Sequence, residues 1–291
     1  MKHLDVVLPL SLTIDRLLQE WLLEDIGRGD RTTQGLVAPG TKVGQALWTA
    51  KAPGMVAGLP IAARVFQLLD PRSTLIPKVA EGERCDRGVV IASIEATLDA
   101  LLTGERVALN LAMRLSGIAT LTHQYVEKIA DLPVRLVDTR KTTPGLRLLE
   151  KYATQVGGAI NHRMGLDDAV MIKDNHIAVA GGIGQAIERI RARIPYPLTI
   201  EVETETLDQV SEALQHQADI IMLDNMPLER MQQAVQLIRK TSDRIKIEAS
   251  GNITLDTIRA VAETGIDFIS TSAPITRSPW LDLSMRMNIE G

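Results

Sequence analysis

Cysteine, aromatic residues and positive charge are all scarce in this sequence, and each shortage excludes a class of protein. The only cysteine, Cys85, excludes an internal disulfide framework and a metal site built from several cysteines. It also indicates a reducing, cytoplasmic setting. Aromatic residues make up 3% of the 291 residues, and the formal net charge is −4. Neither the stacking platform nor the basic surface of a nucleic-acid-binding protein is therefore expected.

Long hydrophobic runs are missing as well. The apolar stretch at 6–12 lies between Asp5 and Asp15 and is too short to cross a membrane. No small-residue cleavage site follows it, which argues against a signal peptide. Hydrophobic residues still make up 45% of the chain and charged residues 23%, so a buried core and a cytoplasmic protein without membrane contact are predicted.

Residues 1–110 have a mixed pattern that predicts an α+β amino-terminal module. An amphipathic helix is expected over 14–24, with apolar residues along one stripe. Strand-like runs at 45–51, 54–58, 75–79 and 88–96 are interrupted by glycine and proline. They indicate a partly antiparallel sheet, and a further helix is predicted over 98–115.

After residue 130 apolar runs without alternation are separated by helical patterns, which is typical of parallel β-α units. The predicted strands are 134–138, 169–173, 198–203, 219–223, 245–250 and 267–271. A closed eight-unit barrel needs roughly 250 residues, whereas 111–277 offers about 165. We therefore predict an incomplete parallel β/α barrel of six or seven strands over 111–277, with a doubly wound sheet as the competing architecture.

Polar residues stand at or just beyond the ends of five of these apolar runs. In a β/α barrel such ends converge on one mouth, where active sites are built, whereas a doubly wound sheet gathers mainly the residues beside its switch point. Convergence of all five favours the barrel. The residues are Asp138, Lys173, Glu203, Asp224 and Ser250.

The segment 138–176 places several cations near this mouth: Arg140, Lys141, His162, Arg163 and Lys173. Guanidinium groups suit bidentate recognition of carboxylates or phosphates, and lysine supplies a compact charge. A ligand with several negative charges is therefore predicted. Taken alone, Arg140 or Arg163 would more often be a surface ion-pair residue, and His162 or His176 a structural residue. Cys85 is also interpreted as structural. Their coincidence at one mouth is what favours a site.

Two acidic residues and two polar turns complete the predicted site. Glu203 and Asp224 offer carboxylates that either bind Mg²⁺ on a phosphorylated substrate or stabilise positive charge at a reacting sugar carbon. The turns at 250–252 and 271–273 follow the last two strands, the usual position of a phosphate site in a barrel.

At these residues the chain resembles the quinolinate phosphoribosyltransferases, and the similarity extends over nearly its whole length. The matching segments are 24–33, 54–59, 104–120, 138–176, 200–204, 220–226, 248–253 and 278–287. The block at 138–176 is the most specific of them. Ser272 stands where the family commonly has glycine, and Arg277 where histidine is frequent.

The resemblance implies an open barrel and a homodimer, or a multiple of it, in which the amino-terminal module of one subunit caps the barrel of the other. It also implies that 278–291 returns to the amino-terminal module. The quinolinate carboxylates would be held by Arg106 from the neighbouring subunit and by Arg140, His162, Arg163 and Lys173. Phosphoribosyl pyrophosphate and its Mg²⁺ would face Lys141, Glu203 and Asp224. The remaining substrate-binding residues would be Thr139, Ser250, Gly251, Asn252, Ser272, Ala273 and Pro274.

The implied reaction joins quinolinate to a phosphoribosyl group and yields nicotinate mononucleotide, pyrophosphate and CO₂ for NAD biosynthesis. Three alternatives stay open at this point. One is a molybdenum-associated paralogue on the same scaffold, and another is an aldolase that uses Lys173 to form a Schiff base. The third is a catalytically silent anion-binding or scaffolding dimer.

Overall fold

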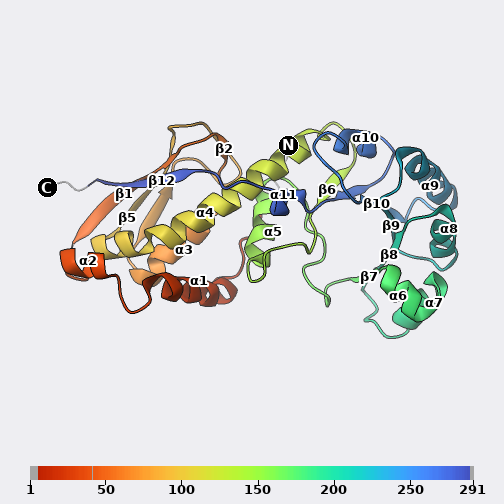
Figure 1. Cartoon of the computed structure of the whole chain (residues 1–291), viewed down its shortest axis with the longest axis horizontal. Coiled ribbons are helices and arrows are strands. Elements are labelled where there is room, and N and C mark those ends of the chain that lie inside the picture. The colour runs from red at the N-terminus through yellow and green to blue at the C-terminus, as the bar shows by residue number, and fades with distance from the viewer. Residues whose placement is uncertain (1–5, 41, 289–291) are drawn as a thin grey trace. The chain divides into compact units, whose positions relative to one another are not determined.

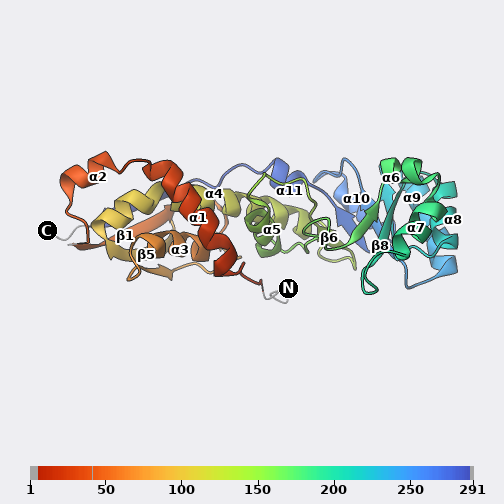
Figure 2. The same cartoon turned by 90° about the horizontal axis from the view of Figure 1, so that it is seen from below.

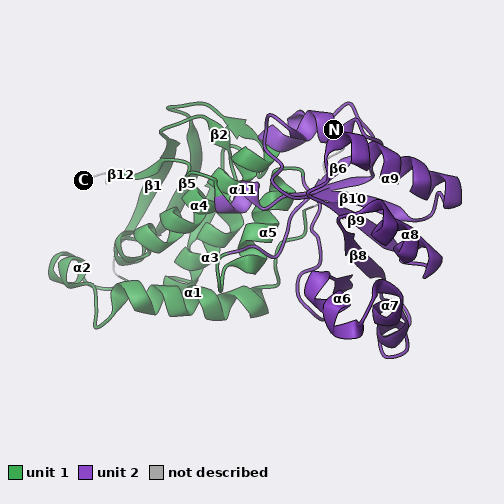
Figure 3. Ribbon diagram, turned by 45° about the vertical axis from the view of Figure 1, so that its right-hand side comes forward, with its two compact units in different colours: residues 1–123, 143–158, 277–291 green, residues 124–142, 159–276 purple. Residues whose placement is uncertain are grey.

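The computed structural model describes residues 6–40 and 42–288, which form two compact units (Figure 3). Unit 1 holds the described parts of 1–123, 143–158 and 277–291, and unit 2 holds 124–142 and 159–276. These units are defined by contacts within the chain. The division into domains at 110/111 and 277/278 stays a prediction.

Unit 1 is built on an antiparallel sheet with the strand order β12-β1-β5-β3. The strands are β1 (Val43–Ala50), β3 (Thr74–Pro77), β5 (Val90–Thr97) and β12 (Leu283–Asn288), and β2 (Gly54–Met55) pairs separately with β4 (Arg84–Cys85). Antiparallel pairing between β12 and β1 brings residues 283–288 back to this sheet. Trp48 and Phe66 are fully buried, with their rings edge to face in the core.

The helices of unit 1 follow the predicted apolar pattern but extend further. They are α1 (Ser11–Ile26), α2 (Arg31–Leu36), α3 (Leu59–Leu69), α4 (Leu98–Glu127) and α5 (Arg147–Val156). Ile14, Leu18 and Leu22 of α1 are buried, and α1 packs against α3. Helix α4 continues past residue 115 through Gly117. Only glycine fits at this position, because a Cβ there would lie 2.0 Å from the carbonyl oxygen of Pro279.

Unit 2 contains a six-stranded parallel sheet with the order β6-β11-β10-β9-β8-β7. The strands are β6 (Arg135–Val137), β7 (Val170–Ile172), β8 (Ile200–Thr204), β9 (Ile220–Asp224), β10 (Lys246–Ser250) and β11 (Phe268–Ser270). From β7 to β11 each strand lies beside the next strand in the sequence, and the first strand, β6, lies beside the last, β11. This arrangement has no switch point, so it excludes the doubly wound sheet and confirms the barrel.

A seventh segment lies beside β6 through a single parallel bridge between Val137 and Ile160. Among the described residues Ile160 has no such pairing with β7, so the barrel is open between these two segments. The prediction of an incomplete barrel with six or seven strands is therefore confirmed.

Helices follow the strands of unit 2, and α7 to α10 lie along the outer face of the sheet (Figures 1 and 2). The helices of this unit are α6 (Asp174–Ala180), α7 (Ile183–Arg191), α8 (Leu207–Gln215), α9 (Leu228–Thr241), α10 (Ile258–Ala262) and the short α11 (Ala273–Thr276) after β11. In residues 6–40 and 42–288, no helix combines the length and apolar character that crossing a membrane requires.

Strand register sorts the side chains of the sheet onto two faces. Glu203 of β8 and Glu248 of β10 both pair with Met222 of β9, and paired residues of a parallel sheet point to the same side. Glu201 lies two residues before Glu203 and shares that face. The alternate residues on the opposite face are fully buried and apolar: Val202, Ile221, Ile247 and Ile269. Because the helices cover that apolar face, the glutamates line the barrel interior.

Candidate functional site

The polar strand-end residues occupy one edge of the parallel sheet. Asp138 and Lys173 directly follow β6 and β7, while Asp224 and Ser250 are the last residues of β9 and β10. Glu203 is the penultimate residue of β8. These five side chains therefore come from the carboxyl ends of five parallel strands, the edge at which barrel enzymes place their chemistry.

Two guanidinium groups, those of Arg140 and Arg163, lie close together at this edge. Partial burial lowers the pKa of Arg163, and the neighbouring charge of Arg140 lowers it further. Arg163 donates one hydrogen bond to the carbonyl oxygen of Ala169 over 2.9 Å, whereas the buried Nε of Arg140 has no hydrogen-bond partner among the described residues. Two adjacent like charges with unused donors fit a ligand that carries more than one carboxylate.

Lys173 is held at the end of β7 by an ion pair with Glu203. The lysine side chain remains 44% exposed and the glutamate 13%, so the ammonium group stays accessible at the edge. The main-chain N–H of Lys173 donates to Nδ1 of His176 over 3.0 Å, which fixes the start of α6. His176 is thus bonded to the residue that opens its own helix.

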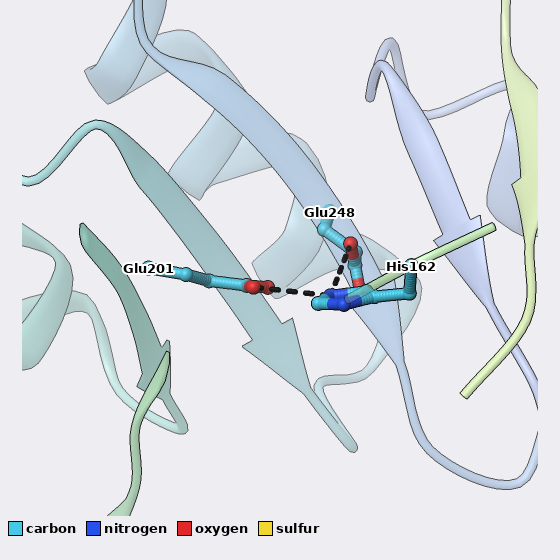
Figure 4. A group of neighbouring side chains, drawn as sticks. All are labelled: His162, Glu201 and Glu248. Carbon is cyan, nitrogen blue, oxygen red and sulfur yellow. Dashed lines mark ion pairs between the residues drawn. The ribbon is translucent and has the colours of Figure 1, made fainter. Parts of the chain in front are cut away.

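His162 is fixed through its main chain and both ring nitrogens. Its N–H donates to Asp138 over 2.9 Å, and its Nδ1 accepts from the N–H of Arg163 over 2.7 Å. Its Nε2 lies 3.1 Å from Glu201 and 3.6 Å from Glu248 (Figure 4). Because these protein groups occupy both nitrogens, direct binding of quinolinate by His162 stays a prediction.

Glu201 and Glu248 are site residues that the sequence pattern did not predict. They are only 3% and 4% exposed. Burial, together with the nearby charge of Glu201, raises the pKa of Glu248 to about 7, against the opposing effects of His162 and Lys173. A signal was present, because each glutamate interrupts an apolar strand and Glu201 stands two residues before Glu203. The sequence alone did not show which face of each strand points into the barrel interior and which face is covered by helices.

The loops after β9 and β10 are bonded to each other. Asn225 donates its main-chain N–H to Ser250 over 3.0 Å and accepts from Nδ2 of Asn252 over 3.2 Å. Its own Nδ2 donates to Asp224 over 2.6 Å. Gly251 has a φ of 97°, and a Cβ there would lie 2.2 Å from Oδ1 of Asn225. Asn225, which the sequence pattern did not predict as a site residue, joins the predicted phosphate loop to Asp224.

The last predicted phosphate segment begins the short helix α11. Ser272 accepts from the N–H groups of Ile275 and Thr276 over 3.0 and 2.9 Å, and the N–H of Ala273 donates to Oγ1 of Thr271 over 3.3 Å. Pro274 is buried within this turn. Ser272 does not have a positive φ, so the backbone at this position does not require glycine.

The remaining predicted residues lie at exposed or separate positions. Lys141 is exposed, and its N–H donates to Oγ1 of Thr139 over 3.0 Å. Arg106 is exposed on α4 within unit 1. All the other predicted site residues belong to unit 2.

The sequence matches two family models that together extend over most of the chain. The model of the quinolinate phosphoribosyl transferase N-terminal domain matches 30–116, and that of the C-terminal domain matches 118–286. A probable nicotinate-nucleotide pyrophosphorylase (carboxylating) of Synechocystis sp. is 60% identical over 280 residues, 96% of this chain and 94% of the relative. The probable nicotinate-nucleotide pyrophosphorylase (carboxylating) of Bacillus subtilis is 44% identical over 278 residues, 96% of this chain and 94% of the relative.

Solved structures give the same result. NadC from Streptococcus pyogenes superposes with a TM-score of 0.91 at 41% identity, covering 97% of this chain and 99% of that one. The nicotinate-nucleotide pyrophosphorylase from Francisella tularensis gives 0.90 at 36% identity, with 97% and 98% covered. The molybdenum-associated paralogue and the aldolase receive no support from these similarities. The chain belongs to the quinolinate phosphoribosyltransferase family.

Proposed function

We propose that this chain joins quinolinate to the phosphoribosyl group of phosphoribosyl pyrophosphate, giving nicotinate mononucleotide, pyrophosphate and CO₂ in NAD biosynthesis. Membership of the family supports this assignment. The observation that carries it is the pair of adjacent guanidinium groups of Arg140 and Arg163, which have unused donors. The accessible ammonium group of Lys173 follows the end of β7 at the same edge of the sheet as Arg140. Quinolinate has two neighbouring carboxylates, so these cations would neutralise both.

The roles of the remaining residues follow from their positions. Glu203 and Asp224 come from adjacent strands, on the interior face, at the end where β8 and β9 stop. Their charge would stabilise the cationic C1 of the ribose as the bond to pyrophosphate breaks, and preorganised charge of this kind is often the largest catalytic contribution. Lys141, Thr139 and the turns at 250–252 and 272–274 would hold phosphate groups.

Mg²⁺ is the metal that this chemistry implies. Mg²⁺ prefers oxygen ligands and binds through one or two carboxylates together with substrate phosphates, and the carboxylates of Glu203 and Asp224 fit that donor set. When bound, the ion would neutralise charge on the leaving pyrophosphate. Glu203 would then serve both the ion and its ion pair with Lys173.

The bond changes follow in order. The C1–oxygen bond to pyrophosphate breaks, and the ring nitrogen of quinolinate forms the new bond to C1. The carboxylate at ring position 2 then leaves as CO₂, its bonding electron pair stays on that ring carbon, and a proton from water replaces it. Arg140 and Arg163 would hold the ring in place through both stages.

The first experiment is incubation of the purified protein with quinolinate, phosphoribosyl pyrophosphate and Mg²⁺, with detection of nicotinate mononucleotide and CO₂. We expect a preference for quinolinate over nicotinate of roughly 10⁴-fold or more in kcat/KM, because nicotinate leaves charged donors unpaired. Arg163→Ala should weaken quinolinate binding, whereas the exposed Arg189→Ala on α7 should not. Failure to form the product, or comparable kcat/KM for nicotinate, refutes the assignment.

We further propose a cytoplasmic homodimer, or a multiple of it, in which the exposed Arg106 reaches the site of the neighbouring subunit. Mixing and reassociating Arg106→Ala with Arg140→Ala tests this arrangement. Half of randomly mixed dimers hold one of each chain, and each of these has one intact site, so about a quarter of the wild-type activity should return. Activity that stays at the level of the separate variants contradicts a shared site.

A further inference from the structure

One exposed residue at the edge of the parallel sheet connects two parts of the site but has no role in the proposed reaction. Asn225 directly follows Asp224, the last residue of β9, and is bonded to the loop 250–252 after β10. Its Nδ2 donates to Oδ2 of Asp224 over 2.6 Å, and its Oδ1 accepts from Nδ2 of Asn252 over 3.2 Å. The amide group of Asn225 therefore bridges a predicted catalytic carboxylate and a predicted phosphate loop.

The chemistry of the two partners fixes the direction in which this amide points. An ionised carboxylate only accepts hydrogen bonds, so the NH₂ group of Asn225 faces Asp224. The amide oxygen is then left for the NH₂ group of Asn252, which only donates. The last torsion of an aspartate side chain is otherwise broadly distributed. The bond from Asn225 therefore restricts the direction in which the carboxylate of Asp224 points.

The backbone around this amide adopts a conformation that residues with a side chain rarely take. In the part of the chain that the structure describes, only Gln217, Asn225 and Asn252 combine a Cβ with a positive φ, which is 52° at Asn225 and 46° at Asn252. Glycine takes a positive φ without the steric cost that a Cβ brings. The hydrogen bonds of the two asparagine side chains offset that cost. Backbone strain of this kind is typical of functional sites, where the surroundings hold it in place.

Buried residues and main-chain bonds hold both sides of the bridge in place. Met226 and Ile253, which directly follow the two asparagines, are buried in the core of unit 2. The main-chain N–H of Asn225 donates to the carbonyl oxygen of Ser250 over 3.0 Å. Ser250 also pairs in register with Asp224 across β10 and β9. The exposed amide of Asn225 is therefore held from below by well-packed residues, so its direction is set by the fold.

We propose that Asn225 is a positioning residue, which directs the carboxylate of Asp224 toward the ribose and holds the loop 250–252 in the shape that binds phosphate. This inference rests on the proposed function and deepens it. Asn225 acts on the substrate through Asp224 and through the loop. One side chain therefore sets both the charge that stabilises C1 and the loop that takes the phosphate. Losing the amide should impair turnover and the binding of phosphoribosyl pyrophosphate together.

Three substitutions at this position separate the amide from the backbone. Asn225→Gly removes the amide and fits the positive φ, whereas Asn225→Asp keeps the shape and the acceptor but cannot donate to Asp224. Each should lower kcat roughly tenfold or more, the effect of losing one hydrogen bond to a charged group. Asn225→Gly should also raise the Kd for phosphoribosyl pyrophosphate, measured by calorimetry with Mg²⁺ and without quinolinate. Asn225→Ala adds backbone strain, so it should melt about 2–8 °C below Asn225→Gly.

Gln217 provides the matched control, because it is the third described residue that has both a side chain and a positive φ. It is exposed and lies between α8 and β9, at the opposite end of that strand from Asp224. Gln217→Gly repeats the backbone change of Asn225→Gly away from the site. Its kcat and its Kd for phosphoribosyl pyrophosphate should therefore stay within about twofold of the wild type. A loss in Gln217→Gly equal to that in Asn225→Gly would assign the effect to the backbone and overturn the proposal.

A double-mutant cycle shows whether Asn225 acts on turnover through Asp224. If it does, Asn225→Gly should change kcat by less than about twofold in the Asp224→Ala background, because the carboxylate that it positions is gone. The weaker binding of phosphoribosyl pyrophosphate should persist in that background, since the loop 250–252 is still released. A purely structural role would lower kcat equally in both backgrounds, and that result overturns the proposal.

Wild-type turnover is measured first, so that the two levels of the argument fail separately. Wild-type protein that forms no nicotinate mononucleotide refutes the proposed function. Active wild-type protein whose kcat is the same in Asn225→Gly and Asn225→Asp as in the wild type refutes the positioning role alone. Calorimetric binding of phosphoribosyl pyrophosphate needs no turnover, and an unchanged Kd in Asn225→Gly contradicts the effect on the loop.

Discussion

Replacing Glu248 by glutamine should change how stability depends on pH. Burial beside Glu201 raises the pKa of Glu248 from its ordinary value of 4.5 to about 7. The folded protein therefore holds this proton more tightly than the unfolded chain does. The resulting stabilisation is fully present below pH 4.5 and is lost as the pH rises through about 7. Glutamine does not titrate, so the variant lacks this loss.

The size of the effect follows from the pKa change. A rise of about 2.5 corresponds to about 3 kcal/mol at 1.36 kcal/mol per pH unit. At about 2–4 °C per kcal/mol for a domain of moderate size, the melting temperature of the variant should gain about 6–12 °C on the wild type between pH 4.5 and pH 8. Ionisable groups that do not face Glu248 titrate alike in both proteins, so their contribution cancels in the difference.

Differential scanning calorimetry at several pH values is the suitable assay, because it separates the transitions of two compact units if they unfold independently. Glu229→Gln serves as the matched control, since that side chain is exposed and its variant should follow the wild type at every pH. Parallel melting curves for Glu248→Gln and the wild type would refute the reasoning, because they would mean that Glu248 ionises equally easily in both states.

Three other predictions concern separate parts of the molecule. Arg114→Ala should lower the free energy of unfolding by about 3–5 kcal/mol, as measured by denaturant titration. The reason is that the variant removes the partner of the fully buried Glu150, whose ion pair with Arg114 spans 2.7 Å. A loss below about 1 kcal/mol would contradict this prediction. Gly251→Ala should raise the KM for phosphoribosyl pyrophosphate, whereas Gly265→Ala should not. Both glycines have a positive φ, but the atom nearest to an added Cβ is 2.2 Å away at Gly251 and 3.4 Å away at Gly265. Equal kinetics of the two variants would show that the loop at Gly251 tolerates a Cβ. Glu203→Ala should lower kcat by more than it raises the KM for quinolinate, and an unchanged kcat would exclude its catalytic role.

The sequence by itself determined the architecture of unit 2. Apolar runs without alternation can only be buried on both faces, and helical patterns of the right length between them make the strands parallel. The short span of 111–277 then limited the barrel to fewer than eight strands. Position in the chain was also enough to bring Asp138, Lys173 and Asp224 to one edge, because all parallel strands end on the same side.

Only the tertiary structure decided which polar groups meet inside the barrel. Glu201 and Glu203 point to the same face of β8 whatever the fold, but strand register decides that this face also holds Glu248. His162 contacts both Glu201 and Glu248, although it lies 39 and 86 positions before them in the chain. No local pattern records such a contact, because its energy comes from burial and shared charge that exist only once the segments are packed together. The same reason explains why the stretch 143–158, predicted within the barrel, makes its contacts in unit 1.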